Sequence, residues 1–204
     1  TPATYIGFWD DIRRLFADGE DARRRGWQAN RFSFNTGDGR CDRCDGQGWQ
    51  TVEMNFLPNV RVLCDGCGGQ RFNAETRQVR WRGQAISEIL NMSVDEALAF
   101  FDPIPSVRRP LQSMQDVGLG YLQLGQPSPT LSGGESQRIK LVTELAKAKS
   151  STKTLYVLDE PTVGLHMADV ERLIGALHRL VEAGNTVLVI EHQLDLWAQS
   201  DWMI

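Results

Sequence analysis

The sequence predicts an α/β protein, part of a parallel sheet with flanking helices, which carries a mixed α+β insertion. Two observations predict it. The apolar runs TLYVLD (154–159) and NTVLVIE (185–191) lie on either side of an amphipathic stretch at 167–183. A strand, a helix and a second apolar strand form a βαβ unit, so we expect both strands to be buried in a parallel sheet. Earlier, glycines and four cysteines punctuate residues 36–72, which is typical of a small metal-stabilised module.

The first third of the chain is predicted to contain a helix and a hairpin. Residues 1–35 carry an amphipathic helical pattern through Ile12, Leu15 and Phe16, followed by an Arg-rich loop. The segment TVEMNFLPNVRVL alternates apolar and polar residues around Leu57-Pro58-Asn59, which predicts a β-hairpin. Phe56 near its tip could act as an apolar wedge or pack beneath the hairpin, and we expect packing. We interpret the WDD near residue 10 and Trp197 as variable surface choices.

Two further helices have recognisable starts. Ser93-Val94-Asp95-Glu96 forms a capping box that opens a helix through ALAFF, ending near Pro103. A second helix is expected over 132–150, after a Gly-Gly start.

Length and composition indicate one domain with a sizeable insertion or two small domains. The 204 residues are 41% hydrophobic and 24% charged, as in globular proteins. No apolar run approaches the length needed to cross a bilayer and no signal peptide opens the chain, so we expect a cytoplasmic protein without membrane contact. The abrupt start and end suggest a piece of something longer.

The basic residues are unevenly distributed, although the net charge is −4. Fifteen arginines and no lysine precede residue 110, which suits phosphate recognition or simply reflects a GC-rich coding sequence. An Arg-rich loop with two aromatic residues predicts a surface that reads the DNA backbone. Its candidate DNA-binding residues are Arg23, Arg24, Arg25 and Arg31, beside Trp27 and Phe32. The acids Asp18, Glu20 and Asp21 leave a mixed solvated face as the alternative.

All four cysteines fall in two C-x-x-C pairs, Cys41/Cys44 and Cys64/Cys67, separated by nineteen residues. This spacing is close to that of a structural zinc site, in which four thiolates leave no position open for water. The glycines that follow each pair let backbone N–H groups turn toward the sulfurs. Disulfides or a redox C-x-x-C pair are the alternatives, but no targeting signal indicates an oxidising compartment.

Three segments near the C-terminal end predict part of a nucleotide site. In TLSGGESQRIKL, Ser132 and the amides of Gly133 and Gly134 begin a helix, where an anion is attracted. Alone, this could be an ordinary helix cap. Asp159 and Glu160 end one apolar strand and could hold a Mg²⁺-bound water and polarise an attacking water. Glu191-His192 ends the next strand and places a titratable ring at the same sheet edge.

These segments resemble the signature and Walker B motifs of ATP-binding-cassette ATPases, but no G-x-x-x-x-G-K-[ST] loop is present. Together with the cysteines, they make the chain similar to the second cassette of the UvrA family of DNA-damage-sensing ATPases in bacterial excision repair. The resemblance runs end to end, through RGWQANRFSFNTGDGRCDRCDGQGW, DVGLGYLQLGQPSPTLSGGESQRIKL and TLYVLDEPTVGLH. Val163 departs from the commoner Thr.

The resemblance implies a partial ABC-type ATPase cassette at 131–204 and a signature-domain insertion at 1–130, with the zinc module at about 36–72. It implies Zn²⁺, ATP with Mg²⁺, double-stranded DNA, a homodimer, and a UvrB-type helicase partner bound outside this chain. The phosphate loop would lie upstream of Thr1, so the chain alone should not hydrolyse ATP. By motif position, the implied nucleotide-binding residues are Ser132, Gly133, Gly134, Gln137, Asp159 and Gly164, with Glu160 the catalytic base and His192 the switch histidine.

Two other functions stay open. One is a paralogue of the same architecture that serves drug tolerance or regulation. The other is a structural zinc module without DNA contact, since each cysteine pair resembles the C-x-x-C-x-G-x-G repeat of DnaJ-type chaperones. The second pair departs from that repeat, because Arg71 stands where its last glycine would be.

Overall fold

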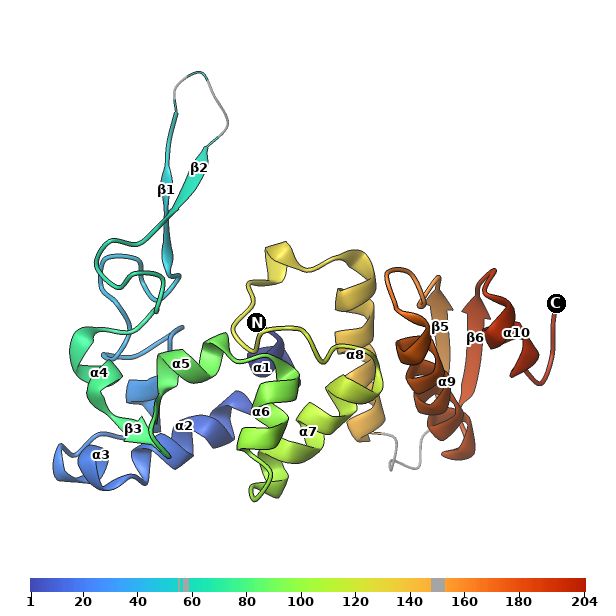
Figure 1. The fold of residues 1–204 in the computed structure, drawn as a ribbon, viewed down its shortest axis with the longest axis horizontal. Coiled ribbons are helices and arrows are strands. Elements are labelled where there is room, and N and C mark those ends of the chain that lie inside the picture. The colour runs from blue at the N-terminus through green and yellow to red at the C-terminus, as the bar shows by residue number, and fades with distance from the viewer. Residues whose placement is uncertain (55, 57–58, 148–152) are drawn as a thin grey trace. The chain divides into compact units, whose positions relative to one another are not determined.

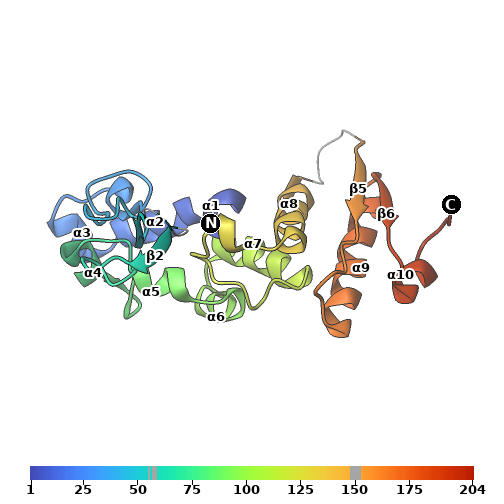
Figure 2. The same ribbon diagram turned by 90° about the horizontal axis from the view of Figure 1, so that it is seen from above.

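The computed structural model describes residues 1–54, 56, 59–147 and 153–204 (Figures 1 and 2). The chain divides into two compact units, one formed by Trp9–Asn91 and one by Thr1–Phe8 with Met92–Ile204. Within the described ranges there are three two-stranded sheets. No helix in these ranges has the length and apolar character that a membrane span requires.

The unit Trp9–Asn91 packs short elements around aromatic side chains. Its elements are α2 (Trp9–Ala17), α3 (Glu20–Arg24), η1 (Ala29–Phe32), β1 (Trp49–Val52), β2 (Val60–Leu63), α4 (Ala74–Gln78), β3 (Arg80–Trp81), β4 (Gln84–Ala85) and α5 (Ile86–Asn91). The predicted helix is confirmed, since Ile12 and Phe16 on α2 are fully buried. Trp9 is only 2% exposed and its ring lies 5.7 Å from that of Phe34, so its interpretation as a surface residue was wrong. It faces the core from the first turn of α2.

The predicted hairpin is present as an antiparallel pair, with Trp49 opposite Leu63 and Val52 opposite Val60. Figure 1 shows it projecting from the helices of its own unit. Leu57 and Pro58, the predicted turn, lie outside the described residues. Phe56 is 97% exposed, so the prediction that it packs beneath the hairpin was wrong. A two-stranded ribbon offers no second layer against which a side chain at its tip could pack.

The second unit contains the remaining elements: α1 (Pro2–Ile6), α6 (Val94–Phe100), α7 (Pro105–Asp116), η2 (Ser128–Thr130), α8 (Gly133–Lys147), β5 (Leu155–Asp159), α9 (Met167–Glu182), β6 (Thr186–Ile190) and α10 (Leu194–Ala198). The predicted capping box of α6 is confirmed. Ser93 Oγ accepts from the N–H of Glu96 at 3.2 Å, and the Glu96 carboxylate accepts from the N–H of Ser93 at 2.8 Å. The helix expected over 132–150 is α8, and residues 148–150 lie outside the described ranges.

The predicted βαβ unit is confirmed: β5 and β6 pair in parallel, with Leu155 opposite Thr186 and Asp159 opposite Ile190. Helix α9 lies against these strands in both views (Figures 1 and 2). The expectation that both strands are buried was wrong, because alternate side chains such as Val157 and Ile190 are each 55% exposed. Successive side chains point to opposite faces of a sheet. The described residues therefore cover one face of this strand pair and leave the other open.

Candidate functional site

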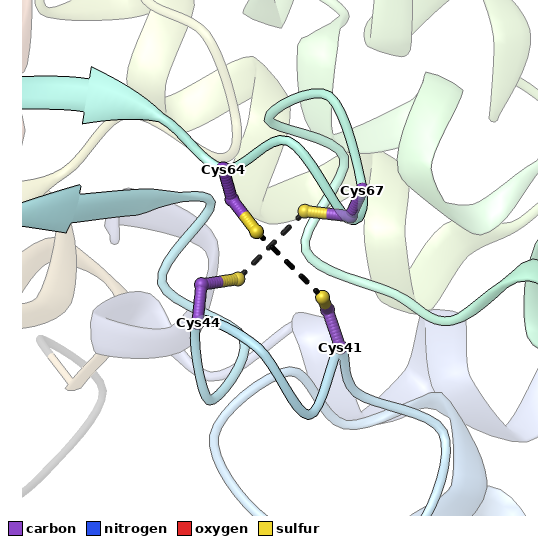
Figure 3. A group of neighbouring side chains, drawn as sticks. All are labelled: Cys41, Cys44, Cys64 and Cys67. Carbon is purple, nitrogen blue, oxygen red and sulfur yellow. Dashed lines mark hydrogen bonds between the residues drawn. The ribbon is translucent and has the colours of Figure 1, made fainter.

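The four cysteines form one buried cluster (Figure 3), although two of them precede the hairpin and two follow it. The sulfurs of Cys41 and Cys64 lie 3.9 Å apart, those of Cys44 and Cys67 lie 3.7 Å apart, and all four are within 4.8 Å of one another. A tetrahedral zinc site with Zn–S bonds of about 2.3 Å has sulfur–sulfur edges of about 3.8 Å. The cluster therefore fits a four-coordinate metal ion such as zinc.

The two cysteine pairs have the same local architecture. The backbone N–H of Gly48, four residues after Cys44, donates to its sulfur at 3.3 Å, as the sequence predicted for a glycine there. Four residues after Cys67, the N–H of Arg71 donates to that sulfur. Gly48 and Arg71 have φ angles of +84° and +69°, both in the left-handed region that glycine favours. Arg71 thus occupies the place of the missing glycine in the same backbone conformation.

Two arginines bring positive charge to this cluster. The guanidinium of Arg71 lies 5.1 Å from the Phe34 ring centre and interacts electrostatically with Cys44 and Cys67. Arg43, which pairs with Asp65 at 2.5 Å, interacts with Cys64 and Cys41. Without a cation, burial raises the pKa of Cys44 to about 12, against the lowering effect of the Gly48 N–H. A bound metal ion removes this cost, because coordinating thiols are deprotonated.

The second candidate site begins at the N-terminus of α8, in the segment Ser132–Gly134, which we call the signature turn. The backbone N–H of Ser132 donates to Glu135 Oε2 at 2.7 Å, and the N–H of Glu135 donates to Ser132 Oγ at 3.2 Å. This reciprocal pair is a capping box. Because Ser132 Oγ accepts from the helix, its own O–H can donate outward, as can the N–H groups of Gly133 and Gly134.

Tyr121, in the loop that follows α7, supports this turn. Its hydroxyl donates to Glu135 Oε1 at 2.6 Å, so both carboxylate oxygens of Glu135 are engaged. Burial raises the pKa of Glu135, but the hydrogen bonds from Tyr121 and Ser132 and the nearby Arg138 outweigh it, and the net pKa is lowered. Glu135 is therefore held as a carboxylate, and the turn is fixed before any ligand arrives. Motif reading did not identify Tyr121.

The carboxyl ends of β5 and β6 bring the predicted acids and histidine together. Asp159 ends β5, and the next residue, Glu160, has its carboxylate 3.7 Å from Nδ1 of His192, which follows β6. These two side chains remain 51% and 75% exposed. Glu160 has a φ of +43°, an uncommon angle for a residue with a side chain. The predicted meeting of the two groups at one sheet edge is thus observed.

Gln137 and Gly164, two further residues predicted to bind nucleotide, are not part of the signature turn. With its amide oriented to match donors to acceptors, Gln137 donates to the carbonyl of Asp159 at 3.2 Å and accepts from its N–H at 3.1 Å. Its amide therefore holds the strand end. Gly164 has a φ of +77° and an open environment.

Two residues hold the loop that follows β5. From the sequence, Glu191 was named only as a strand end, and Arg138 was not singled out. The carboxylate of Glu191 accepts from the N–H of Thr162 at 2.9 Å and from its hydroxyl, and also from the N–H of His192 at 2.9 Å. On α8, Arg138 is 2% exposed and donates to the carbonyls of Pro161 at 3.2 Å and Val163 at 3.3 Å. The sequence places Arg138 in the helix that follows the signature turn, but neither its burial nor its carbonyl partners can be read from a motif.

Trp197 is 37% exposed, as expected for a surface residue. Its indole N–H also donates to the carbonyl of Glu191 at 2.8 Å, which ties it to the same strand end.

The four candidate DNA-binding arginines lie in two different environments. Arg23 and Arg24 are exposed and pair with Asp18 and Glu20. Arg25 and Arg31 have their guanidinium carbons 4.8 and 4.2 Å from the Trp27 ring centre. Arg31 is further held by Thr76 at 3.1 Å and Glu75 at 3.0 Å, and its side chain is only 16% exposed. Arg23, Arg24 and Arg25 therefore present more accessible charge than Arg31.

Comparison with known proteins gives matches that span the whole of this chain. It is 58% identical over 203 residues to the UvrABC system protein A of Thermus thermophilus and 54% identical to that of Mycobacterium tuberculosis. Each match covers 100% of this chain and 21% of the other protein. The chain therefore spans about a fifth of the length of the curated relatives it matches. No family model matches it.

The fold is shared with a solved structure. The crystal structure of UvrA2 from Deinococcus radiodurans matches with a TM-score of 0.90 and 52% sequence identity, over 98% of this chain and 24% of that one. The cysteine cluster, the signature turn and the strand edge thus all lie in a segment that the curated relatives match in sequence and that UvrA2 also matches in fold.

Proposed function

Since the chain is a segment of the UvrA type, we propose that it belongs to an ABC-type ATPase that recognises DNA damage in nucleotide excision repair. In this proposal residues 131–204 are the second half of an ATPase cassette and residues 1–130 are the insertion that faces DNA. This division follows motif order, whereas the two compact units follow contacts within the chain. The protein acts in the cytoplasm.

The signature turn is proposed to bind the γ-phosphate of an ATP held by another cassette. The support is its set of outward donors: the Ser132 hydroxyl and the N–H groups of Gly133 and Gly134 at the positive end of α8. Both oxygens of the Glu135 carboxylate accept hydrogen bonds, from the Tyr121 hydroxyl and the Ser132 N–H, which offsets the repulsion that this charge would exert on a phosphate. The other cassette supplies the phosphate loop, which this sequence does not contain.

At the strand edge, Glu160 is proposed to accept a proton from the attacking water, and His192 to orient the reacting groups. Their separation of 3.7 Å and their exposure support this, because both must face a ligand that arrives from outside. Asp159 would support the Mg²⁺ that accompanies ATP and offsets phosphate charge. Gly164 would join this site to the neighbouring one. On this proposal the chain alone does not hydrolyse ATP.

The cysteine cluster is proposed to hold a structural Zn²⁺ ion through Cys41, Cys44, Cys64 and Cys67. All four positions of a tetrahedron are then filled by sulfur, so the ion fixes the base of the β1–β2 hairpin and has no open position for catalysis. The insertion would contact damaged double-stranded DNA through the exposed Arg23, Arg24 and Arg25. A homodimer and a UvrB-type helicase, bound by a domain outside these residues, complete the proposed assembly.

One observation carries this proposal: a single unit holds both a capped signature turn and a Glu160–His192 pair at the end of parallel strands, in a chain 58% identical to a UvrABC system protein A. An ordinary helix cap has no reason to accompany such a strand edge.

DNA binding can be tested on the chain itself by fluorescence anisotropy. A labelled duplex, intact or with one bulky adduct, is titrated with the chain before and after zinc chelation. We expect binding that weakens with salt and on chelation, because phosphate contacts release counterions and the module needs its metal. Arg25→Gln should weaken it several-fold, while Arg172→Gln, an exposed arginine on α9, should not. Absence of binding at low salt would contradict the proposal that residues 1–130 contact DNA.

A paralogue of the same architecture is the alternative, because the matches cover only about a fifth of the length of the curated relatives and a paralogue would carry the same segment. A search of the full-length sequence for a UvrB-binding domain separates them, since a repair subunit needs that domain and a regulatory paralogue does not.

A further inference from the structure

Arg138 is the largest side chain among the fully buried residues of the described chain, and it is a charged one. A buried guanidinium is costly unless its donors are satisfied. Nη1 is satisfied by two carbonyls, while Nε has no partner among the described residues. The guanidinium also interacts with the carboxylate of Glu135 and with Tyr121. Arg138 therefore has partners in the signature turn region and in the residues that follow β5.

The first link runs from Arg138 to the signature turn, which lies one helical turn earlier on α8. A Cβ atom built on Gly134 would lie 3.2 Å from Nη1 of Arg138 and 3.3 Å from the carbonyl oxygen of Val163. Gly134 therefore packs directly on the guanidinium and on the loop that it binds. Arg138 also interacts with Glu135, three residues before it, whose carboxylate caps the turn.

The second link runs from Arg138 to the segment Glu160–Gly164, which we call the 160–164 loop. Arg138 binds the loop through the carbonyls of Pro161 and Val163, and Glu191 binds it through Thr162. The loop is thus held from α8 on one side and from the end of β6 on the other.

Glu160 has a left-handed φ of +43°, so its conformation depends on the hydrogen bonds that hold the loop. Such a conformation costs free energy in a residue with a side chain and persists only where the surroundings enforce it. The backbone N–H of Glu160 donates to Ile190 at 2.9 Å, and the next residues are fixed by Arg138 and Glu191. Releasing the loop allows Glu160 to relax, which would move its carboxylate away from His192.

We propose that Arg138 is a positioning residue that couples the signature turn to the 160–164 loop. An anion bound at the signature turn restricts the motion of the start of α8, including Arg138. The hydrogen bonds of Arg138 to the carbonyls of Pro161 and Val163 then restrict the loop. Glu160, which begins that loop, is thereby held in place. Coupling of this kind is reciprocal, so an ordered loop also favours the anion-ready turn. The inference rests on the proposed ATPase function for its catalytic consequence, but the coupling itself is a property of this chain.

The structural part is tested on the chain by amide hydrogen exchange at Thr162, Val163 and Leu165. Arg138→Gln should accelerate exchange at these amides by about 10-fold or more, because two hydrogen bonds to the loop are lost. Arg138→Lys keeps the charge and most of the volume but loses the planar fork, so it should show an intermediate effect. The control Arg172→Gln alters an exposed arginine on α9 and should leave these amides unchanged. Unchanged exchange in both Arg138 variants overturns the proposal.

The catalytic part is tested by steady-state ATP hydrolysis in a full-length UvrA-type protein that carries this segment. Arg138→Gln should lower kcat at least about 10-fold with less change in KM, because a misplaced Glu160 affects the chemical step more than ground-state binding. Arg138→Lys should recover part of kcat. A loss of folded protein would also lower apparent kcat with KM unchanged, so kcat is calculated per active site, from the fraction of protein that binds nucleotide; a kcat that returns to normal after this correction overturns the catalytic part.

The two hypotheses fail in different ways. If Glu160→Gln leaves hydrolysis intact, the proposed ATPase role of this edge fails, whatever Arg138 does, and hydrogen exchange still decides the coupling. If Arg138→Gln loosens the loop but leaves kcat unchanged in an active protein, the inference that Arg138 positions Glu160 for catalysis is overturned, while its hold on the loop and the proposed function stand.

Discussion

The cysteine cluster and the strand edge at Glu160 and His192 are both groups of polar side chains, but they are built in opposite ways. The four cysteines are at most 6% exposed and face one another. Glu160 and His192 are 51% and 75% exposed and face outward. In the first group this chain supplies all four sulfur donors, so a metal ion bound there is enclosed by residues of this chain. The second group is complete only when something binds from outside, and the buried residues Arg138 and Glu191 hold it ready.

The two groups are also stabilised by different means. Around the cysteines, the β1–β2 hairpin has exposed side chains on both strands, so metal ligation has to replace a hydrophobic core. Around the strand edge, hydrogen bonds to backbone groups fix a loop that already lies beside a helix-covered sheet. We therefore expect the first region to respond to loss of a ligand by unfolding and the second by loss of activity.

The largest effect is predicted for Cys64→Ala. One missing thiolate opens the tetrahedron, and structural zinc contributes roughly 10 kcal/mol or more to the folding of small modules. The variant should lose its zinc, measured by metal analysis, and its hairpin amides should exchange freely. The matched control Thr51→Ala changes an exposed residue of β1 and should keep the metal. Full zinc retention in Cys64→Ala would refute the four-cysteine assignment.

The next effect is predicted for Glu160→Gln in a full-length protein that carries this segment. Loss of the base should lower kcat for ATP hydrolysis by about 10²- to 10⁴-fold while nucleotide binding is retained. Glu171→Gln, an exposed acid on α9, is the control and should turn over normally. Undiminished hydrolysis in Glu160→Gln would show that the open edge is not catalytic. Hairpin exchange should not change in either variant, which keeps the contrast between the two regions sharp.

Features that depend on local pattern were predictable from the sequence. The capping box at Ser93, the parallel pairing of β5 with β6 and the meeting of the four cysteines all follow from residue spacing. The meeting of Glu160 and His192 was predictable for a related reason, because the carboxyl ends of parallel strands share one sheet edge.

The residues that sequence reasoning missed act through contacts between segments far apart in the chain. Arg138 reaches carbonyls 23 and 25 residues away, and backbone carbonyls leave no trace in a motif. Phe56 and Trp9 were assigned to the wrong environments for the same reason. Whether an apolar side chain is covered depends on which elements fold back over it, and periodicity within one segment does not contain that information.

A smaller, pH-dependent effect is predicted at Glu191. Burial raises the pKa of its carboxyl, but hydrogen bonds from Thr162, His192 and Gln193 outweigh it and lower the net pKa. Its stabilising effect is therefore fully present above the ordinary glutamate pKa and is lost as pH falls through the lowered pKa of the folded state.

In the wild-type chain, protection of the Thr162 amide should fall over that acidic window, measured by hydrogen exchange corrected for intrinsic pH dependence. Glu191→Gln should show low protection at all pH values, with a cost of about 1–3 kcal/mol for mismatched donors. The exposed acid Glu171 again provides the control substitution. A wild-type profile that is flat through this window would mean that Glu191 does not hold the loop.

The smallest effect is predicted for Tyr121→Phe, which removes the hydroxyl that donates to Glu135 at 2.6 Å. The other oxygen of Glu135 still accepts from Ser132, so the signature turn should remain capped and lose about 1 kcal/mol of support or less. We expect KM for ATP in the full-length protein to rise about 2- to 5-fold with kcat nearly unchanged. The similarly exposed Tyr5 provides the control Tyr5→Phe. If Tyr121→Phe instead lowered kcat as Arg138→Gln should, support of the turn and placement of Glu160 would be a single function, and Tyr121 would belong to the coupling through Arg138.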